Sequence, residues 1–343
     1  MREETIAFIK IGRSKRRFRF VLVTAILGAL AVLLCCAMLM LGNTIYPVSD
    51  VVRALSGEQM QGVSFAVNTI RLPRMLAGLF SGFAFGLAGS VFQTLLRNPL
   101  ANPNIIGITS GSSAAAVFSI VVLQASGAVT SALSVAGGLA TVLVTYILTG
   151  SKRFSGGRLI LIGLGLQAML NALISWLLLI SSESNVPAAL RWLSGSLNGS
   201  QMEGLAPIVS ATLLLTPVVV FFGRDLSMLE LGEDSALSLG VHTGRTRVLL
   251  IVSSVFLVAI ATAATGPISF ISFLACPIAK RLVGGGCSHT VPAGLFGAVL
   301  VLSADLFGQF AFETRFPVGV ITGILGAPYL IFLLIKMNRN GEF

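Results

Sequence analysis

The strongest constraint on this chain is a series of long apolar runs that recurs along nearly its whole length. An α-helix needs about 20 mostly apolar residues to cross the hydrocarbon core of a bilayer. Runs of about this length lie at residues 21–41, 72–95, 105–124, 128–149, 158–181, 204–223, 246–265, 267–283, 291–312 and 317–335. They predict an all-α membrane protein with ten transmembrane helices.

The division of the stretch from 246 to 283 into two spans rests on its central dipeptide. Gly266 and Pro267 interrupt the apolar run, and proline disfavours continuation of a helix. One unbroken helix over the whole stretch would also be far longer than a bilayer is thick. We therefore expect one span to end near Gly266 and the next to follow it.

The content of charged residues excludes a soluble protein. Asp, Glu, Lys and Arg make up 10% of the 343 residues, whereas a soluble domain carries about 25%. So few charged side chains cannot cover the surface of a soluble protein of this size. A soluble enzyme and a disordered chain are both excluded.

The basic residues indicate the topology. The chain has 23 Lys and Arg against 13 Asp and Glu, and cytoplasmic loops of membrane proteins carry an excess of Lys and Arg. With ten spans and a cytoplasmic N-terminus, both termini are cytoplasmic. All but five basic residues then lie inside, and those outside are Arg53, Arg71, Arg74, Arg191 and Arg315. The positive charge is therefore interpreted as a topology signal, with no nucleic acid as partner and membrane lipid around the chain.

One transmembrane domain is predicted, at residues 21–336, between cytoplasmic tails at 1–20 and 337–343. Its largest inner loop, 224–245, has the pattern of a short helix. Glu233 and Asp234 stand where the first turn would begin, which favours them in the field of the helix dipole, and Gly240 is suited to end it.

The same loop carries apolar residues that could contact a partner. Ala236, Leu237 and Leu239 alternate with its polar residues. Such a helix suits docking into a cleft of a soluble protein. An ordinary solvated connector is the other interpretation, and the pattern alone does not decide between them.

Charge within the spans is scarce. Asp305 is the one acidic residue clearly inside a span, and an intramembrane carboxylate is a functional candidate. A proton-coupled carrier usually strings several such groups together, so pairing with a neighbouring helix or capping is favoured over a proton relay. The four cysteines and two histidines show no metal-ligand spacing, and no metal site is predicted.

Small residues recur at helical spacing in the second span. Gly78, Gly82 and Gly86 are followed by Ser90, and such a stripe lets two helix backbones approach closely. Helix packing is the predicted role of this stripe.

Several short segments together resemble the FecCD-type permease family of iron–siderophore and cobalamin ABC importers. In chain order they are Arg71-Leu72-Pro73-Arg74, Gly89-Ser90-Val91-Phe92-Gln93, Asn98-Pro99-Leu100-Ala101-Asn102-Pro103, Leu231-Gly232-Glu233-Asp234, Leu239-Gly240-Val241, Gly266-Pro267-Ile268-Ser269-Phe270-Ile271, Pro317-Val318-Gly319-Val320 and Leu325-Gly326. The stretch 192–199 resembles the ferric catecholate siderophore branch more than the cobalamin branch.

The resemblance implies a type II ABC importer permease in the plasma (inner) membrane of a bacterium. It implies a second permease subunit, in a homodimer or heterodimer with the heterodimer favoured. It also implies two ATPase subunits and an extracytoplasmic substrate-binding protein. The chain has no Gly-x-x-x-x-Gly-Lys-Ser/Thr motif, so ATP and Mg²⁺ are expected on the ATPase, with no cofactor on this chain and no enzyme activity of its own.

The resemblance also implies roles for individual residues. Arg71 and Arg74 match arginines that dock the binding protein, and anchoring in lipid headgroups is the alternative. The positions that match the coupling helix contacting the ATPase are Gly232, Glu233, Asp234, Leu239 and Gly240. Those that match the cytoplasmic gate are Asn98, Leu100, Gly156 and Gly157, although the two glycines stand where the cobalamin permease has hydroxyl residues.

Import of iron(III)–siderophore complexes by alternating access is therefore the predicted function. The alternatives are a cobalamin or haem permease of the same family and a proton-coupled secondary carrier, which would need ion-coupling residues within the spans. A membrane-embedded enzyme ranks last, because both histidines lie in loops.

Overall fold

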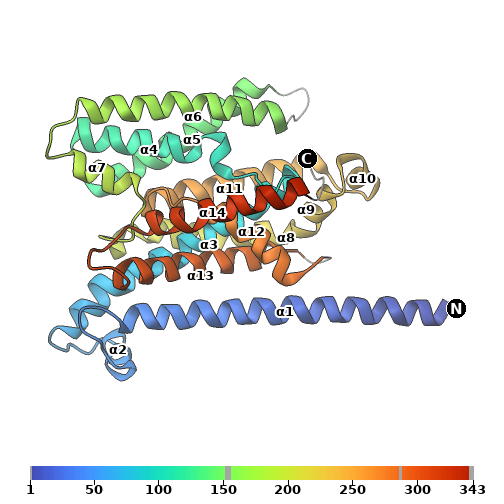
Figure 1. The fold of residues 1–343 in the computed structure, drawn as a ribbon, viewed down its shortest axis with the longest axis horizontal. Coiled ribbons are helices and arrows are strands. Elements are labelled where there is room, and N and C mark those ends of the chain that lie inside the picture. The colour runs from blue at the N-terminus through green and yellow to red at the C-terminus, as the bar shows by residue number, and fades with distance from the viewer. Residues whose placement is uncertain (1, 151–155, 286–287, 340–343) are drawn as a thin grey trace.

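The computed structural model describes residues 2–150, 156–285 and 288–339. The regular elements of these residues are helices, drawn in Figure 1. The α-helices are α1 (Arg2–Met40), α2 (Val48–Leu55), α3 (Leu72–Leu95), α4 (Ile108–Phe118), α5 (Gly127–Thr149), α6 (Gly156–Leu179), α7 (Val186–Leu193), α8 (Ala206–Phe221), α9 (Gly223–Glu230), α10 (Glu233–Ser238), α11 (Thr243–Thr265), α12 (Ile271–Val283), α13 (Thr290–Phe310) and α14 (Val318–Arg339). Shorter helical turns are η1 (Phe65–Arg71), η2 (Pro103–Ile106), η3 (Ser119–Leu123) and η4 (Met202–Gly204).

Each of the ten apolar runs coincides with one of these helices. Within the described residues, eight helices are long and apolar enough to cross a membrane. The other two runs form shorter helices, α4 extended by η3 to Leu123 and the 13-residue α12. The predicted all-α membrane fold is confirmed, with eight long spans.

The predicted break at Gly266 is also confirmed. Helix α11 ends at Thr265, Gly266 adopts φ +71°, and α12 begins only at Ile271. At 1.5 Å per residue α12 is about 20 Å long, shorter than the roughly 30 Å hydrocarbon core. Non-helical backbone at membrane depth is tolerated where protein surrounds it, and most of α12 is buried in this chain.

The N-terminal segment differs from a simple tail. Helix α1 begins at Arg2 and runs without a break into the first span. The Arg19 side chain donates to the carbonyl oxygens of Leu282 (2.8 Å) and Arg281 (3.0 Å), at the end of α12. The basic segment is thereby tied to the C-terminal end of α12.

Helix α3 forms the centre of the bundle, where it packs against α13, α11 and α12. The small-residue stripe predicted there is confirmed, because a Cβ on Gly82 would lie 2.7 Å from the Gly297 carbonyl oxygen of α13. A Cβ on Gly86 would overlap the Ala293 carbonyl. The backbones of α3 and α13 therefore touch, which fixes side chains of the two helices in register.

The two ends of the bundle carry different elements. Figure 1 shows the start of α1, the last turn of α14, and α9 and α10 at one end, with α2 and α7 at the opposite end. The end that holds α10 also holds the basic segments predicted to be cytoplasmic. We refer to it as the inner end and to the other as the outer end.

Candidate functional site

Arg74 forms the most buried ion pair described in the structure. It lies in the first turn of α3, after Pro73, and its Nε and Nη2 donate to Oδ2 and Oδ1 of Asp305 on α13, both at 2.8 Å. The side chains of Arg74 and Asp305 are only 11% and 1% exposed. A two-point contact of this kind fixes orientation as well as distance, so it joins α3 to α13 near the outer end.

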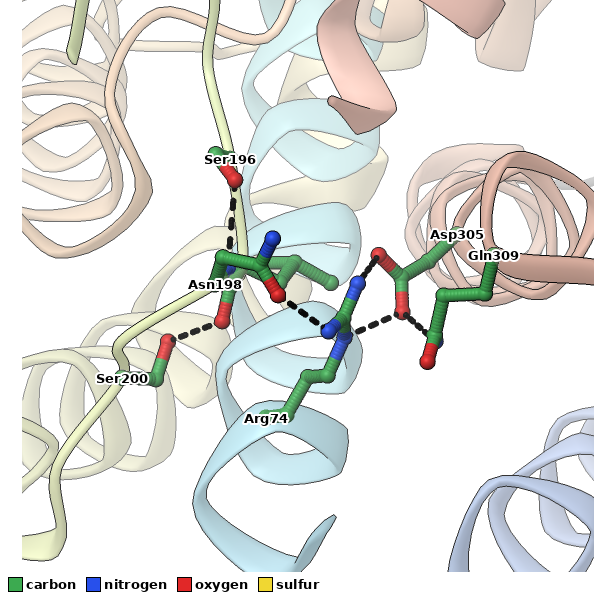
Figure 2. A network of polar contacts seen from close by, with 7 residues as sticks. Arg74, Ser196, Asn198, Ser200, Asp305 and Gln309 are labelled. Carbon is green, nitrogen blue, oxygen red and sulfur yellow. Dashed lines mark hydrogen bonds and ion pairs between the residues drawn. The ribbon is translucent and has the colours of Figure 1, made fainter. Parts of the chain in front are cut away.

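Two amide side chains complete this network, which Figure 2 shows from close by. Gln309, one turn along α13, donates its Nε2 to Asp305 Oδ2 at 2.8 Å. On the other side, Arg74 Nη1 donates to Asn198 Oδ1. The backbone N–H of Asn198 donates to Ser196 Oγ at 3.1 Å, so the loop between α7 and η4 is tied to the same arginine.

Arg71, one turn earlier, has a different set of partners. Its Nη1 donates to the carbonyl oxygens of Leu39 and Met40, each at 2.8 Å, and its Nη2 donates to that of Thr44 at 2.7 Å. The guanidinium also lies over the Tyr46 ring, 4.6 Å from the centroid. The last carbonyls of a helix lack partners within it, and a cation beside them is favourable. Arg71 therefore caps the outer end of α1.

Both arginines predicted to dock a binding protein thus point into the protein. Arg71 is 9% exposed, and Asp305 supplies a partner for Arg74 that the sequence left unnamed. Asp305 contacts a neighbouring helix through this ion pair, as the sequence favoured, and its contribution to holding the two helices together stays a prediction. The docking role stays a prediction. Arg74 has a small exposed edge beside the exposed Asn198, which a binding protein could contact.

At the inner end, two glycines delimit the predicted coupling helix. Gly232 and Gly240 have φ of +121° and +84°, on either side of α10. L-residues with a Cβ rarely adopt such angles, so glycine is needed for both sharp turns. Glu233 pairs with Arg247 of α11 at 3.3 Å, while Asp234 lies exposed at the start of α10.

The apolar residues in α10 and directly after it divide between two faces. Ala236 is fully buried, whereas Leu237 and Leu239 are 54% and 58% exposed. The exposed leucines form a small apolar knob at the inner end of the bundle, beside the two carboxylates. Exposed apolar groups bounded by polar ones are typical of contact surfaces.

The predicted gate residues fall at two separate places. Asn98 follows α3, and its Oδ1 accepts a hydrogen bond from the Leu100 N–H at 2.8 Å. Gly156 begins α6, and Gly157 is exposed, with open space where a Cβ would stand. Residues 151–155 before them lie outside the described residues, and Gly157 is not among the residues that line the cavity beside Asn98.

Asn98 lines a cavity of about 680 Å³ at the inner end. Its walls come from the end of α3, from α12 and from α14, with Glu230 of α9 at the edge. In the sequence, the basic residues of this cavity indicated only the topology of the chain. They come from three separate segments, so no local pattern could have shown that they share one cavity.

A family model and known permeases each match this chain over most of its length. The family model described as the FecCD transport family matches residues 15–336. The chain is 38% identical to the ferric enterobactin transport system permease protein FepG of Escherichia coli (strain K12), over 85% of this chain and 89% of that one. It is 35% identical to FepD of the same transport system and strain, over 88% and 92%.

A solved structure also matches over nearly the whole chain. It is described as an inward-facing conformation of a putative metal-chelate type ABC transporter. The TM-score is 0.81 and the sequences are 30% identical, over 92% of this chain and 99% of that one.

Proposed function

The chain belongs to the FecCD transport family, and from that premise we propose that it is the transmembrane permease of an ABC importer for iron(III)–siderophore complexes. It is a multi-pass protein of the bacterial inner membrane and, as a permease subunit, not itself an enzyme. The family match over residues 15–336 is the observation that carries the proposal. The identity to two ferric enterobactin permeases supports the cargo.

The proposed assembly pairs this chain with a second permease, two cytoplasmic ATPases and an extracytoplasmic binding protein. A heterodimer is favoured, because FepG and FepD are distinct permeases of one transport system and the chain resembles both. Ten spans with both termini inside fit the fold, with α12 completing its crossing through the non-helical segment 266–270, in which Gly266 and Ile268 are buried. The placement of the start of α1, the last turn of α14 and the short helix α10 at one end supports this topology (Figure 1).

In the proposed mechanism, α10 receives the motion of the ATPase. The knob of Leu237 and Leu239 enters a cleft of that subunit, and the Glu233–Arg247 pair carries the displacement to α11. Helix α9 has its own connection, because Glu230 contacts Lys280 of α12 at 2.5 Å. Movement of these helices would open and close the inner end around Asn98.

At the outer end, we propose that the binding protein docks beside Arg74. The network of Arg74, Asp305, Asn198 and Gln309 holds α3, α13 and the loop between α7 and η4 together. A carboxylate of the binding protein would approach the exposed edge of this network. Arg71 would act by fixing the end of α1 beneath the same surface.

Reconstitution tests the proposal. Proteoliposomes that contain this chain, its second permease and the ATPase should take up ferric siderophore only with binding protein outside and ATP inside. An ATPase variant without hydrolysis is the matched control and should abolish uptake. Uptake driven by a proton gradient without the ATPase would overturn the proposal, and selective uptake of cobalamin or haem would keep the importer but replace its cargo.

A further inference from the structure

The inner cavity has the size and position of a ligand site. At about 680 Å³ it falls within the range of roughly 300–1,000 Å³ that is typical of small-molecule sites. It is lined by residues from the end of α3, from α12 and from α14. The last turn of α14 lies at the end of the bundle that holds α10 (Figure 1). A molecule that leaves the permease toward the cytoplasm could occupy it.

The charge of the cavity is strongly one-sided. Its lining holds four cations, Arg97, Lys280, Arg281 and Lys336, and the single carboxylate Glu230. Glu230 is engaged with Lys280. The described part of the chain offers no carboxylate within ion-pair distance of the other three cations. A cleft lined by charge of one sign focuses the field and concentrates ions of the opposite sign.

Three of the cations, Arg97, Arg281 and Lys336, are charged groups of the lining that remain free to bind, whereas several of its neutral polar atoms are engaged within the protein. Gln93 Nε2 donates to the carbonyl oxygens of Phe273 (3.1 Å) and Ser272 (3.3 Å), which holds α3 to α12. The Thr94 hydroxyl donates to the Ser90 carbonyl at 2.9 Å. Asn98 accepts from its own loop. A ligand would therefore meet these three cations, with the Asn98 amide nitrogen and the Tyr329 hydroxyl as further donors.

The remaining wall is apolar and partly aromatic. Tyr329, Phe332 and Leu333 of α14 line one side, and Cys276 and Pro277 of α12 line another. A cavity with cations and aromatic rings fits an anion that presents an apolar surface. Small hydrated anions would leave this wall unused.

We infer that this cavity is an inner binding site for an anionic, aromatic ferric chelate of the catecholate class. Iron(III) held by three catecholate dianions carries a net threefold negative charge and turns its aromatic rings outward. Arg97, Arg281 and Lys336 match that charge, and cations beside the catechol rings gain a further attraction. The inference rests on the proposed import of ferric siderophores and adds the charge class and the residues that recognise it.

The cavity is also placed to respond to the ATPase. A Cβ on Gly232 would lie 3.7 Å from Arg97 Nη1, so this cation sits next to the turn that begins α10. Glu230 of α9, next to the same turn, reaches the opposite rim through Lys280. Displacement of α9 and α10 would move both rims, and the chelate could then be released.

Direct binding to the full chain in nanodiscs of neutral lipid tests the inference without any transport. The probes are ferric enterobactin, a trianionic tris-catecholate, and ferrichrome, an uncharged hydroxamate complex. We expect the anionic probe to bind more tightly, with an affinity that falls as salt is raised. The variant Arg97→Gln, Arg281→Gln, Lys336→Gln should weaken its binding by about tenfold or more, since hydrogen bonds to charged groups are strong.

Two further variants make the result decisive. Arg13→Gln, Lys15→Gln, Arg17→Gln removes the same charge from an exposed part of α1, and its affinity should stay within about twofold of the parent. Arg97→Lys, Arg281→Lys, Lys336→Arg keeps the charge and should retain most of the binding. An equal loss in the α1 variant, or equal binding of both probes, would overturn the inference.

The proposed function and the inference can fail separately. Normal ferric enterobactin uptake by the reconstituted importer, with unchanged chelate binding in the cavity variant, would leave the function standing and reject the site. Anionic phospholipid that co-purifies with the parent and is lost from the cavity variant, with chelate binding unaffected, would assign the cavity to a lipid headgroup and also reject it.

Discussion

At the scale of single residues, the ion pair between Arg74 and Asp305 is the feature with the clearest energetic consequence. The Asp305 side chain is 1% exposed, and its carboxylate accepts two hydrogen bonds from Arg74 and one from Gln309. Removal of one member of a buried pair leaves an uncompensated charge and costs about 3–5 kcal/mol. We therefore expect Asp305→Asn to destabilise the protein by roughly that amount, seen as a lower unfolding midpoint in detergent.

The exposed pair of Arg53 and Glu58 is the matched control. Its side chains are 58% and 52% exposed, and exposed pairs contribute at most about 1 kcal/mol. Arg53→Gln should therefore leave the midpoint nearly unchanged. If Asp305→Asn is no more destabilising than Arg53→Gln, the pair does not hold α3 to α13.

Docking at Arg74 can be tested without breaking that pair. Asn198→Asp keeps an oxygen that can accept from Arg74 but adds a negative charge at the outer surface. If an acidic residue of the binding protein approaches Arg74, this charge should repel it and lower the affinity several-fold, mainly through slower association at low salt. Ser184→Asp, in another exposed outer loop, is the control. Unchanged affinity of Asn198→Asp, measured by surface plasmon resonance, would argue against docking there.

At the scale of elements, helix positions followed from the sequence much better than contacts did. Apolar runs and the Gly266-Pro267 break identified the helices, because span length and proline chemistry are local properties. The partner of Asp305 was not predictable, since Arg74 lies 231 positions away along the chain. Arg71 was likewise expected at a surface, and only the fold shows the carbonyl end of α1 beside it.

The short helix α10 allows a test of coupling. Replacing Glu233 and Asp234 by Lys should uncouple ATP hydrolysis from transport, because it reverses the charge beside the exposed knob of Leu237 and Leu239. The expected result is continued ATP hydrolysis in proteoliposomes with little uptake. Glu58→Lys, at the outer end, controls for the change of charge. Normal uptake by the double variant would show that the loop is only a connector.

At the scale of the whole molecule, the basic residues and the arrangement of the helices agree. The outer loops are balanced in charge, while the basic segments gather at the end with α10. Three of these basic residues, Arg97, Arg281 and Lys336, line the same cavity. Composition cannot show this, because they lie far apart along the chain. A net charge therefore predicts which way a membrane protein faces, and the fold decides which of its cations act together.

The crossing of α12 decides the topology of everything after it. With 13 residues it is too short to span alone, but a complete crossing places Gly285 inside, Glu313 outside and Asn338 inside. If α12 instead turned back, all three positions would exchange sides, and Lys336 and Arg339 would lie outside, against the usual distribution of basic residues. We therefore expect the complete crossing.

Single cysteines distinguish the two topologies when the four native cysteines are first replaced by serine. An impermeant maleimide applied to intact spheroplasts should label Glu313→Cys, whereas Gly285→Cys and Asn338→Cys should react only after the membrane is opened. All three positions are exposed in the structure, so failure to label reflects the membrane rather than burial. Ser238→Cys in α10 serves as the internal reference for the inner side, and labelling of Gly285→Cys together with exclusion of Glu313→Cys would reject the ten-span topology. The cavity between α3, α12 and α14 depends on this result, since only the complete crossing opens it to the cytoplasm.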